Sequence, residues 1–185
     1  MIEIKRKWRI VTFDIETTGL NADYSHMICC VIKEYNGSSF TYRIDNPKYG
    51  DKFNDKKLVE DVVNKLNQYD VIVSWNGTMF DKTYINTRLL INRSKVLLTP
   101  KYNRDLIFPA RFKFRLASRR LKYVGQVVLG KTNKTFTTPF VWGALVRGEE
   151  WAIDFMVEHC RKDVLDTERL YKRFLPFLSE NLKRK

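Results

Sequence analysis

Short runs of apolar and β-branched residues alternate along the chain with segments in which apolar residues recur at helical spacing. An Asn36–Gly37 pair separates the second run from the third, which is typical of a β-hairpin. The runs predict strands at residues 8–15, 27–32, 39–44, 71–75 and 102–107. Three strands therefore come before the first segment of helical period.

The helical segments occupy most of the remaining chain. Helices are predicted after a cap at Asn54 or Asp55, at 82–92, between a Ser118 cap and a stop at Gly130, and at 150–174 before Pro176. This order favours an α/β fold in which helices flank a mixed central β-sheet. The sequence has no internal repeat and no Pro/Gly-rich linker, so a single domain over residues 1–185 is expected.

Composition narrows the class of protein. Of 185 residues, 44% are hydrophobic, which is enough for a substantial core. No apolar run approaches the ~18 residues of a membrane helix, and the N-terminus lacks the plan of a signal peptide, so no membrane partner is expected. The cysteines Cys29, Cys30 and Cys160 are odd in number, and two are adjacent. They favour core packing in a reducing compartment over a disulfide framework.

Basic residues are concentrated in one segment. The net charge is +13, and residues 101–134 hold ten Lys and Arg against the single acid Asp105. Nine of the thirteen excess charges therefore lie in that segment. Such a distribution favours a polyanionic partner, most simply nucleic acid.

Two pairs of side chains and one further acid are candidates for chemistry. Asp14 and Glu16 end the first predicted strand and project from one face, where they repel each other unless a cation such as Mg²⁺ lies between them. The alternative is two solvated acids. Asp81 follows the strand at 71–75, where it is a metal ligand or a helix N-cap. His159 and Asp163, four residues apart, share a face of the last helix as site residues or as a surface pair.

Together the motifs resemble a known family. Residues 13–20 (Phe-Asp-Ile-Glu-Thr-Thr-Gly-Leu), 75–81 (Trp-Asn-Gly-Thr-Met-Phe-Asp) and 159–171 (His-Cys-Arg-Lys-Asp-Val-Leu-Asp-Thr-Glu-Arg-Leu-Tyr) resemble, in order, the three motifs of DEDD (DnaQ-like) 3′→5′ exonucleases. Residues 120–125 (Arg-Leu-Lys-Tyr-Val-Gly) resemble a segment of the stand-alone, YprB-like members. The motifs span nearly the whole chain.

The resemblance implies a ribonuclease-H-like three-layer fold and a two-metal mechanism. Asp14, Glu16, Asp81 and Asp163 would hold two Mg²⁺ or Mn²⁺ ions, which stabilise the attacking and leaving oxygens. His159 would act as general base, since an imidazole has an ordinary pKa of about 6.5. The product would be a nucleoside 5′-monophosphate. One departure stands out: the family has Tyr-x3-Asp or His-x4-Asp, whereas this chain has His159 at the tyrosine's spacing.

Several residues are expected to contact the nucleic acid. The resemblance implies that the terminal nucleotide lies against Thr17, Thr18, Leu20, Asn76 and Phe80; for Leu20 and Phe80 the alternative is core packing. The alternation of charge and aromatic rings in Arg111-Phe-Lys113-Phe-Arg115 predicts an extended segment whose two sides bind phosphates and bases, or a basic edge strand with its rings in the core. The phosphate track would continue over Arg119, Arg120, Lys122, Lys131 and Lys134.

Three functions follow as hypotheses. The first is a metal-dependent 3′→5′ exonuclease on DNA or RNA with single-stranded or frayed 3′ ends. The second is a nucleic-acid-binding accessory protein with weak or lost catalysis, and the third is a structure-specific endonuclease on the same fold. Because the chain carries no polymerase domain, a proofreading role would require a separate polymerase or repair partner. Size and Asn/Lys-rich composition favour the cytoplasm of a bacterial or phage-infected cell.

Overall fold

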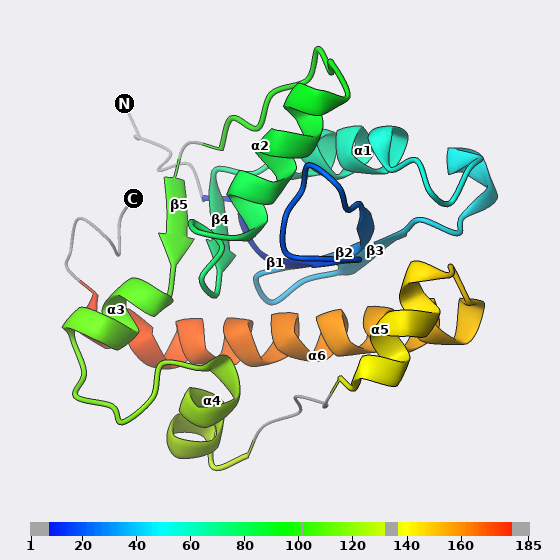
Figure 1. Cartoon of the computed structure of the whole chain (residues 1–185). Helices are drawn as coiled ribbons and strands as arrows, with labels where there is room; N and C mark the ends of the chain where they lie inside the picture. The colour runs from blue at the N-terminus through cyan, green and yellow to red at the C-terminus, as the bar shows by residue number, and fades with distance from the viewer. Residues whose placement is uncertain (1–7, 101, 132–136, 179–185) are drawn as a thin grey trace, which may run out of the picture.

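A five-stranded β-sheet forms the centre of the molecule (Figure 1). The computed structural model describes residues 8–100, 102–131 and 137–178. The strands are β1 (Ile10–Thr17), β2 (Met27–Glu34), β3 (Ser39–Arg43), β4 (Val71–Ser74) and β5 (Tyr102–Asp105). Their order is β3-β2-β1-β4-β5; β1 and β3 pair antiparallel with β2, whereas β4 pairs parallel with β1 and β5. The predicted mixed sheet is confirmed.

Helices cover both faces of this sheet. They are α1 (Lys56–Leu66), α2 (Asp81–Ile91), α3 (Ile107–Phe112), α4 (Leu121–Leu129), α5 (Pro139–Val146) and α6 (Glu150–Phe174), with 3-10 turns η1 (Pro47–Tyr49) and η2 (Leu175–Phe177). Figure 1 shows α1 and α2 on one side of the sheet and the long α6 crossing the other. The predicted α/β class is confirmed, and α6 has the predicted bounds.

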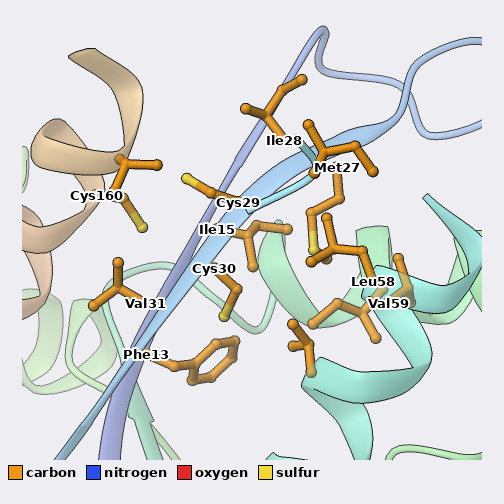
Figure 2. Close-up of a cluster of buried hydrophobic side chains, with 14 of the residues drawn as sticks. Phe13, Ile15, Met27, Ile28, Cys29, Cys30, Val31, Leu58, Val59 and Cys160 are labelled. Atoms are coloured by element: carbon orange, nitrogen blue, oxygen red, sulfur yellow. The ribbon is translucent and has the colours of Figure 1, made fainter. Parts of the chain in front are cut away.

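β2 lies at the centre of the core because it is apolar on both faces. Residues 27–32 are all buried, as expected of a strand with helices on each side. Figure 2 shows Cys29 pointing toward Cys160 of α6, whereas Cys30 lies with Phe13 on the side of Leu58 of α1. All three cysteines are free and buried, which confirms their predicted core role. β1 thus runs through the core and ends at its edge, where Asp14 and Glu16 lie.

The prediction of an extended segment at 111–115 is wrong. β5 ends at Asp105, and α3 begins at Ile107 and runs through Arg111 to Phe112. The helix forms because Leu106 and Ala110, four residues apart, are both buried in the same apolar cluster. The two rings then separate: Phe112 is exposed, whereas Phe114 packs 4.8 Å from Phe174 between ring centroids.

The predicted helix starts are confirmed in part. Of the two residues proposed before α1, Asn54 accepts a hydrogen bond of 3.2 Å from Lys56 N, the first residue of the helix. Asp55 makes no side-chain cap; it is buried and accepts hydrogen bonds from Met27 N and Arg88. Ser118 accepts a hydrogen bond from Arg120 N, and α4 begins only at Leu121. Helix α5 was not predicted, although its Thr138 cap and Pro139 at the first turn are a typical start signal.

Within the part of the chain that the structure describes, no helix is both long and apolar enough to cross a bilayer.

Candidate active site

Asp14 and Glu16 lie at the end of β1, where that strand leaves the core. Both residues are half-buried. The buried Ile15 lies between them, and its side chain points to the opposite face of the sheet. The pairing of β1 with β2 shifts between Glu16 and Thr17. The strand therefore presents both carboxylates on one side at its end, as the sequence predicted.

Asp81 is joined directly to this strand. It is the first residue of α2, and its Oδ1 accepts a hydrogen bond of 3.1 Å from Ile15 N, the amide between Asp14 and Glu16. The alternative reading of Asp81 as an N-cap does not hold, because Phe80 occupies that position. Burial is the main reason that the pKa of Asp81 is raised to about 7, and the negative charge of Asp105 adds to it. A neighbouring cation would therefore stabilise ionised Asp81.

The loop before Asp81 is ordered by an acid whose role the sequence reading missed. Asp105, at the end of β5, accepts hydrogen bonds from Asn76 N at 2.7 Å and Thr78 N at 2.9 Å. It also accepts from Ile107 N at 3.1 Å. Asn76 has a φ of 64°, a conformation that asparagine tolerates better than most residues. Asp105 is thus an anchor for the loop rather than part of the cleft lining. The sequence shows only an acid within the predicted strand at 102–107, and the role of Asp105 depends on partners that the fold brings to it.

His159 and Asp163 come from the middle of α6 and are both buried. His159 Nε2 lies 3.7 Å from Glu16 Oε1 and 3.9 Å from Asp163 Oδ2. The helix is tied to β1 by Cys160, whose Sγ donates to the Asp14 carbonyl over 3.2 Å. With three residues between His159 and Asp163, the imidazole therefore still lies close to Glu16 and Asp163. This agrees with the prediction that His159 and Asp163 share a helical face.

These side chains line one cleft of about 690 Å³. Its lining includes Asp14, Glu16, Trp75, Asn76, Phe80, Asp81, Arg119, Arg120, Leu121, Lys122, Thr137, His159 and Asp163. The structure thus brings together the four acids and His159, and adds three cations from the start of α4. The predicted contacts at Arg111, Lys113 and Arg115 are outside this lining, since α3 and the turn after it carry them away. Lys131 is also outside it, and Lys134 lies outside the described residues.

The loop at 18–26 forms a second hollow of about 360 Å³ beside this cleft. Leu20 is strongly exposed there, so the alternative of core packing does not apply to it. Phe80 lines both hollows and also packs against the main core, so core packing holds for it in part. Thr17 and Thr18 use their hydroxyls inside the loop: Thr17 Oγ1 donates to Gly19 O, and Thr18 Oγ1 contacts His26 Nδ1 at 3.3 Å. Neither threonine lines the cleft, so any contact with a nucleotide would involve their backbone or a rearranged hydroxyl.

Helix α2 holds this loop in place. Tyr84 OH and Ser25 Oγ are 2.7 Å apart, and Arg88 Nη1 donates to Ala22 O over 2.8 Å. Arg88 is itself fixed by a buried ion pair with Asp55 at 2.8 Å. The helix that begins with Asp81 therefore also positions Leu20.

The donor chemistry of the cleft fits divalent cations. Among the described residues, no three His, Cys, Asp or Glu side chains already stand together as a metal-binding cluster. Carboxylate oxygens are, however, the ligands that Mg²⁺ and Mn²⁺ prefer. Four carboxylate side chains line one cleft, those of Asp14, Glu16, Asp81 and Asp163. Because burial raises the pKa of Asp81, a cation beside this carboxylate would stabilise its ionised form.

Comparison with known proteins identifies the family. The model of the RNase H superfamily matches residues 11–175, so the chain belongs to that superfamily. The ribonuclease-H-like fold that the motifs implied is thereby confirmed. Nuclease activity on nucleic acids is the activity that this membership supports. A sequence comparison with characterised proteins finds no match.

A solved structure agrees on the fold. The family B DNA polymerase from the hyperthermophilic archaeon Pyrobaculum calidifontis matches with a TM-score of 0.70 and 18% identity. The match covers 93% of this chain and 25% of the polymerase. This chain therefore spans about a quarter of the polymerase's length, and at that identity the likeness establishes the fold.

Proposed function

We propose that the protein is a metal-dependent 3′→5′ exonuclease that releases nucleoside 5′-monophosphates from single-stranded or frayed ends. The observation that carries the proposal is the meeting of four carboxylates and one imidazole, from β1, α2 and α6, in one cleft. A module that only binds nucleic acid has no need of such a group, because acids repel phosphates. The order of the three DEDD-like motifs supports the 3′→5′ direction.

Each residue has a task in this mechanism. Asp14, Glu16, Asp81 and Asp163 would hold two Mg²⁺ or Mn²⁺ ions, which supply an activated water and stabilise charge on the phosphate oxygens. His159 would take the proton of the attacking water through Nε2, the ring nitrogen that faces Glu16. Arg119, on the cleft lining, would bind the phosphate backbone. The water oxygen would bond to phosphorus as the P–O3′ bond breaks, so the phosphate leaves on the released nucleotide. The 3′ oxygen of the shortened strand would take a proton from solvent and become its new 3′-hydroxyl.

The neighbouring hollow suits the end of a strand. Leu20 and Phe80 offer apolar surface beside the acids, where an unpaired terminal base would stack. A single-stranded or frayed 3′ end is therefore the kind of end that this surface would bind. A polymerase or repair partner is the natural source of such ends, in keeping with a quarter-length match to a polymerase.

The direct test is cleavage of 5′-labelled single-stranded DNA and RNA with Mg²⁺, Mn²⁺ or EDTA. We expect a ladder that shortens from the 3′ end with either metal ion and intact substrate in EDTA. Asp14→Asn should abolish the ladder, whereas the matched control Asp61→Asn, an exposed acid paired with Lys48, should not. Intact oligonucleotide in every lane, with binding retained, would instead establish the accessory protein.

Two further measurements separate the remaining alternatives. Cleavage of circular single-stranded DNA, which has no ends, would show an endonuclease. His159→Gln should lower kcat by about 10²- to 10⁴-fold with little change in KM, because a general base acts in the transition state. An unchanged kcat would remove His159 from the mechanism.

A further inference from the structure

An exposed pair of aromatic rings lies at the N-terminal end of α6, outside the cleft. Phe140 of α5 and Trp151 of α6 stack with ring centroids 5.5 Å apart and planes 24° from parallel. Phe140 is 71% exposed and Trp151 43% exposed. Figure 1 shows α5 against this end of α6. Large rings that stay exposed beside a functional site are typical of binding surfaces.

The pair is connected to the cleft along one face of α6. Trp151, Phe155 and His159 follow each other at intervals of four residues, so they lie on one helical ridge. Phe155 stacks on His159, with centroids 6.5 Å apart and planes 14° from parallel. Eight residues of helix place Trp151 about 12 Å from His159. A stacked single strand advances about 3.4 Å per nucleotide, so three to four nucleotides span that distance.

Acidic and basic side chains are paired around the rings. Arg147 and the Trp151 indole both donate to Glu149, over 2.7 Å and 2.6 Å, so this acid is neutralised and the indole ring is held in place. Asp154 shares Arg43 with Asp45, and each of these two pairs has a contact of 2.6 Å. Lys52 Nζ donates to the Gly148 carbonyl over 2.8 Å, a neutral acceptor that leaves the positive charge at this corner.

We propose that Phe140 and Trp151 form a stacking platform for single-stranded nucleic acid, which binds bases three to four nucleotides from the scissile phosphate. The proposal rests on the proposed function in that the strand's end occupies the cleft. Rings that stack bases beside cations that meet phosphates are the usual means of binding single strands without sequence preference. The platform would fix the strand's path and make binding depend on its length.

The test compares a long substrate with one that fills only the cleft. Binding of a labelled 12-nucleotide single strand is measured by fluorescence anisotropy in EDTA, and hydrolysis of the p-nitrophenyl ester of thymidine 5′-monophosphate is measured with Mn²⁺. Trp151→Ala and Phe140→Ala should each weaken binding of the long strand about tenfold and leave hydrolysis of the ester unchanged. Trp151→Phe, which keeps a ring, should bind nearly as well as the wild type.

Two controls locate the effect. Phe177→Ala removes an exposed ring beyond the other end of α6 and should not change binding. An abasic site placed three or four nucleotides from the 3′ end should weaken wild-type binding, but it should weaken binding to Trp151→Ala much less. Wild-type affinity in both alanine variants would overturn the platform, as would an equal loss on the ester. If the wild type cleaves neither substrate while Trp151→Ala still binds weakly, the proposed function fails and the platform stands.

Discussion

Gly77 has no room for a side chain at the point where the loop turns toward Asp81. A Cβ at this position would lie 2.6 Å from Ser74 Cβ and 3.3 Å from Asp81 Oδ2, and it would also overlap the Ser74 hydroxyl. The close approach brings the loop onto the end of β4, and this approach sets the position of Asp81. A glycine is therefore required here for space, since its φ is not in the left-handed region.

Gly77→Ala should disturb both stability and activity. Overpacking of this kind costs about 1 to 3 kcal/mol, and displacement of Asp81 by a fraction of an ångström should lower cleavage by up to about a hundredfold. Urea unfolding and oligonucleotide cleavage measure the two effects. Gly143→Ala is the matched control, because a Cβ in that helical position meets Arg147 only at 3.4 Å. Full activity in Gly77→Ala would show that the loop yields without moving Asp81.

At the residue scale, the sequence predicted which acids lie together better than it predicted the contacts that support them. Asp14, Glu16 and Asp163 could be found because strand and helix periods fix which side chains share a face. The anchor Asp105 could not, because its partners Asn76 and Thr78 are about 30 residues away in the chain and become neighbours only when β4 and β5 pair.

The hairpin between β2 and β3 is held by a carboxylate from α6. Glu168 Oε1 accepts from Asn36 N over 3.0 Å and lies 3.1 Å from Lys172 Nζ, and its Oε2 lies 3.7 Å from Lys33 Nζ. Burial opposes ionisation of Glu168, but the Asn36 amide and the two lysines outweigh it and hold its pKa below its ordinary value. Ionised Glu168 therefore joins a turn to the far end of the long helix.

Stability should depend on the ionisation of Glu168. Because its pKa is depressed in the folded state, its contribution is present above the unfolded pKa of about 4.5 and is lost as pH falls through the folded pKa. Glu168→Gln should destabilise by about 1 to 2 kcal/mol at pH 7, and this difference should shrink toward pH 3. Thermal unfolding at several pH values measures it. Glu158→Gln, an exposed control on the same helix, should show little change; a pH-independent difference would contradict the assignment.

A hydrogen bond joins Arg119, just before α4, to Trp75, the residue that follows β4. Trp75 Nε1 donates to the Arg119 carbonyl over 3.1 Å, and both residues line the cleft. Trp75→Phe keeps an aromatic ring and removes the bond. We expect the KM for a single-stranded oligonucleotide to rise about 2- to 10-fold with kcat nearly constant, because the phosphate contacts loosen while the acids stay in place. Steady-state kinetics measure the split.

A matched control for that variant is Trp8→Phe, since Trp8 packs on Tyr102 outside the cleft. An equal rise in KM in both variants, or a fall in kcat for Trp75→Phe, would show that the bond does not act through the basic segment.

At the scale of elements, the spacing of apolar residues predicted which segments are strands or helices and in which order they come. The pairing of the strands in the sheet depends on tertiary structure. β1, β2, β4 and α6 could be predicted because each buries apolar residues in a regular or continuous pattern. β3 buries none of its residues fully, and the Asn36–Gly37 turn before it was the stronger signal. The segment at 111–115 could not be predicted, because its alternation of charge and aromatic rings resembles a strand, while burial of Leu106 and Ala110 against the sheet selects a helix. Tertiary packing outweighs a local pattern of five residues.

Basic side chains lie both in the cleft and elsewhere on the surface of the molecule. The net charge is +13, and residues 101–134 carry most of the excess. The fold separates this segment into two parts: Arg111, in α3, is outside the cleft lining, whereas Arg119 is part of it. Total charge attracts a polyanion at long range, whereas only the second part lies in the cleft with the acids.

Salt dependence of binding should separate these two contributions. For single strands, the logarithm of the binding constant falls with the logarithm of salt concentration by about 0.7 for each phosphate contacted. Arg119→Gln should therefore reduce the slope by about 0.7, whereas Arg111→Gln, a change of equal charge in the same segment, should leave it near the wild-type value. Binding in EDTA between about 50 and 300 mM KCl gives the slopes. Equal reductions would mean that the strand is held by the basic surface as a whole, and that the cleft alone does not set its path.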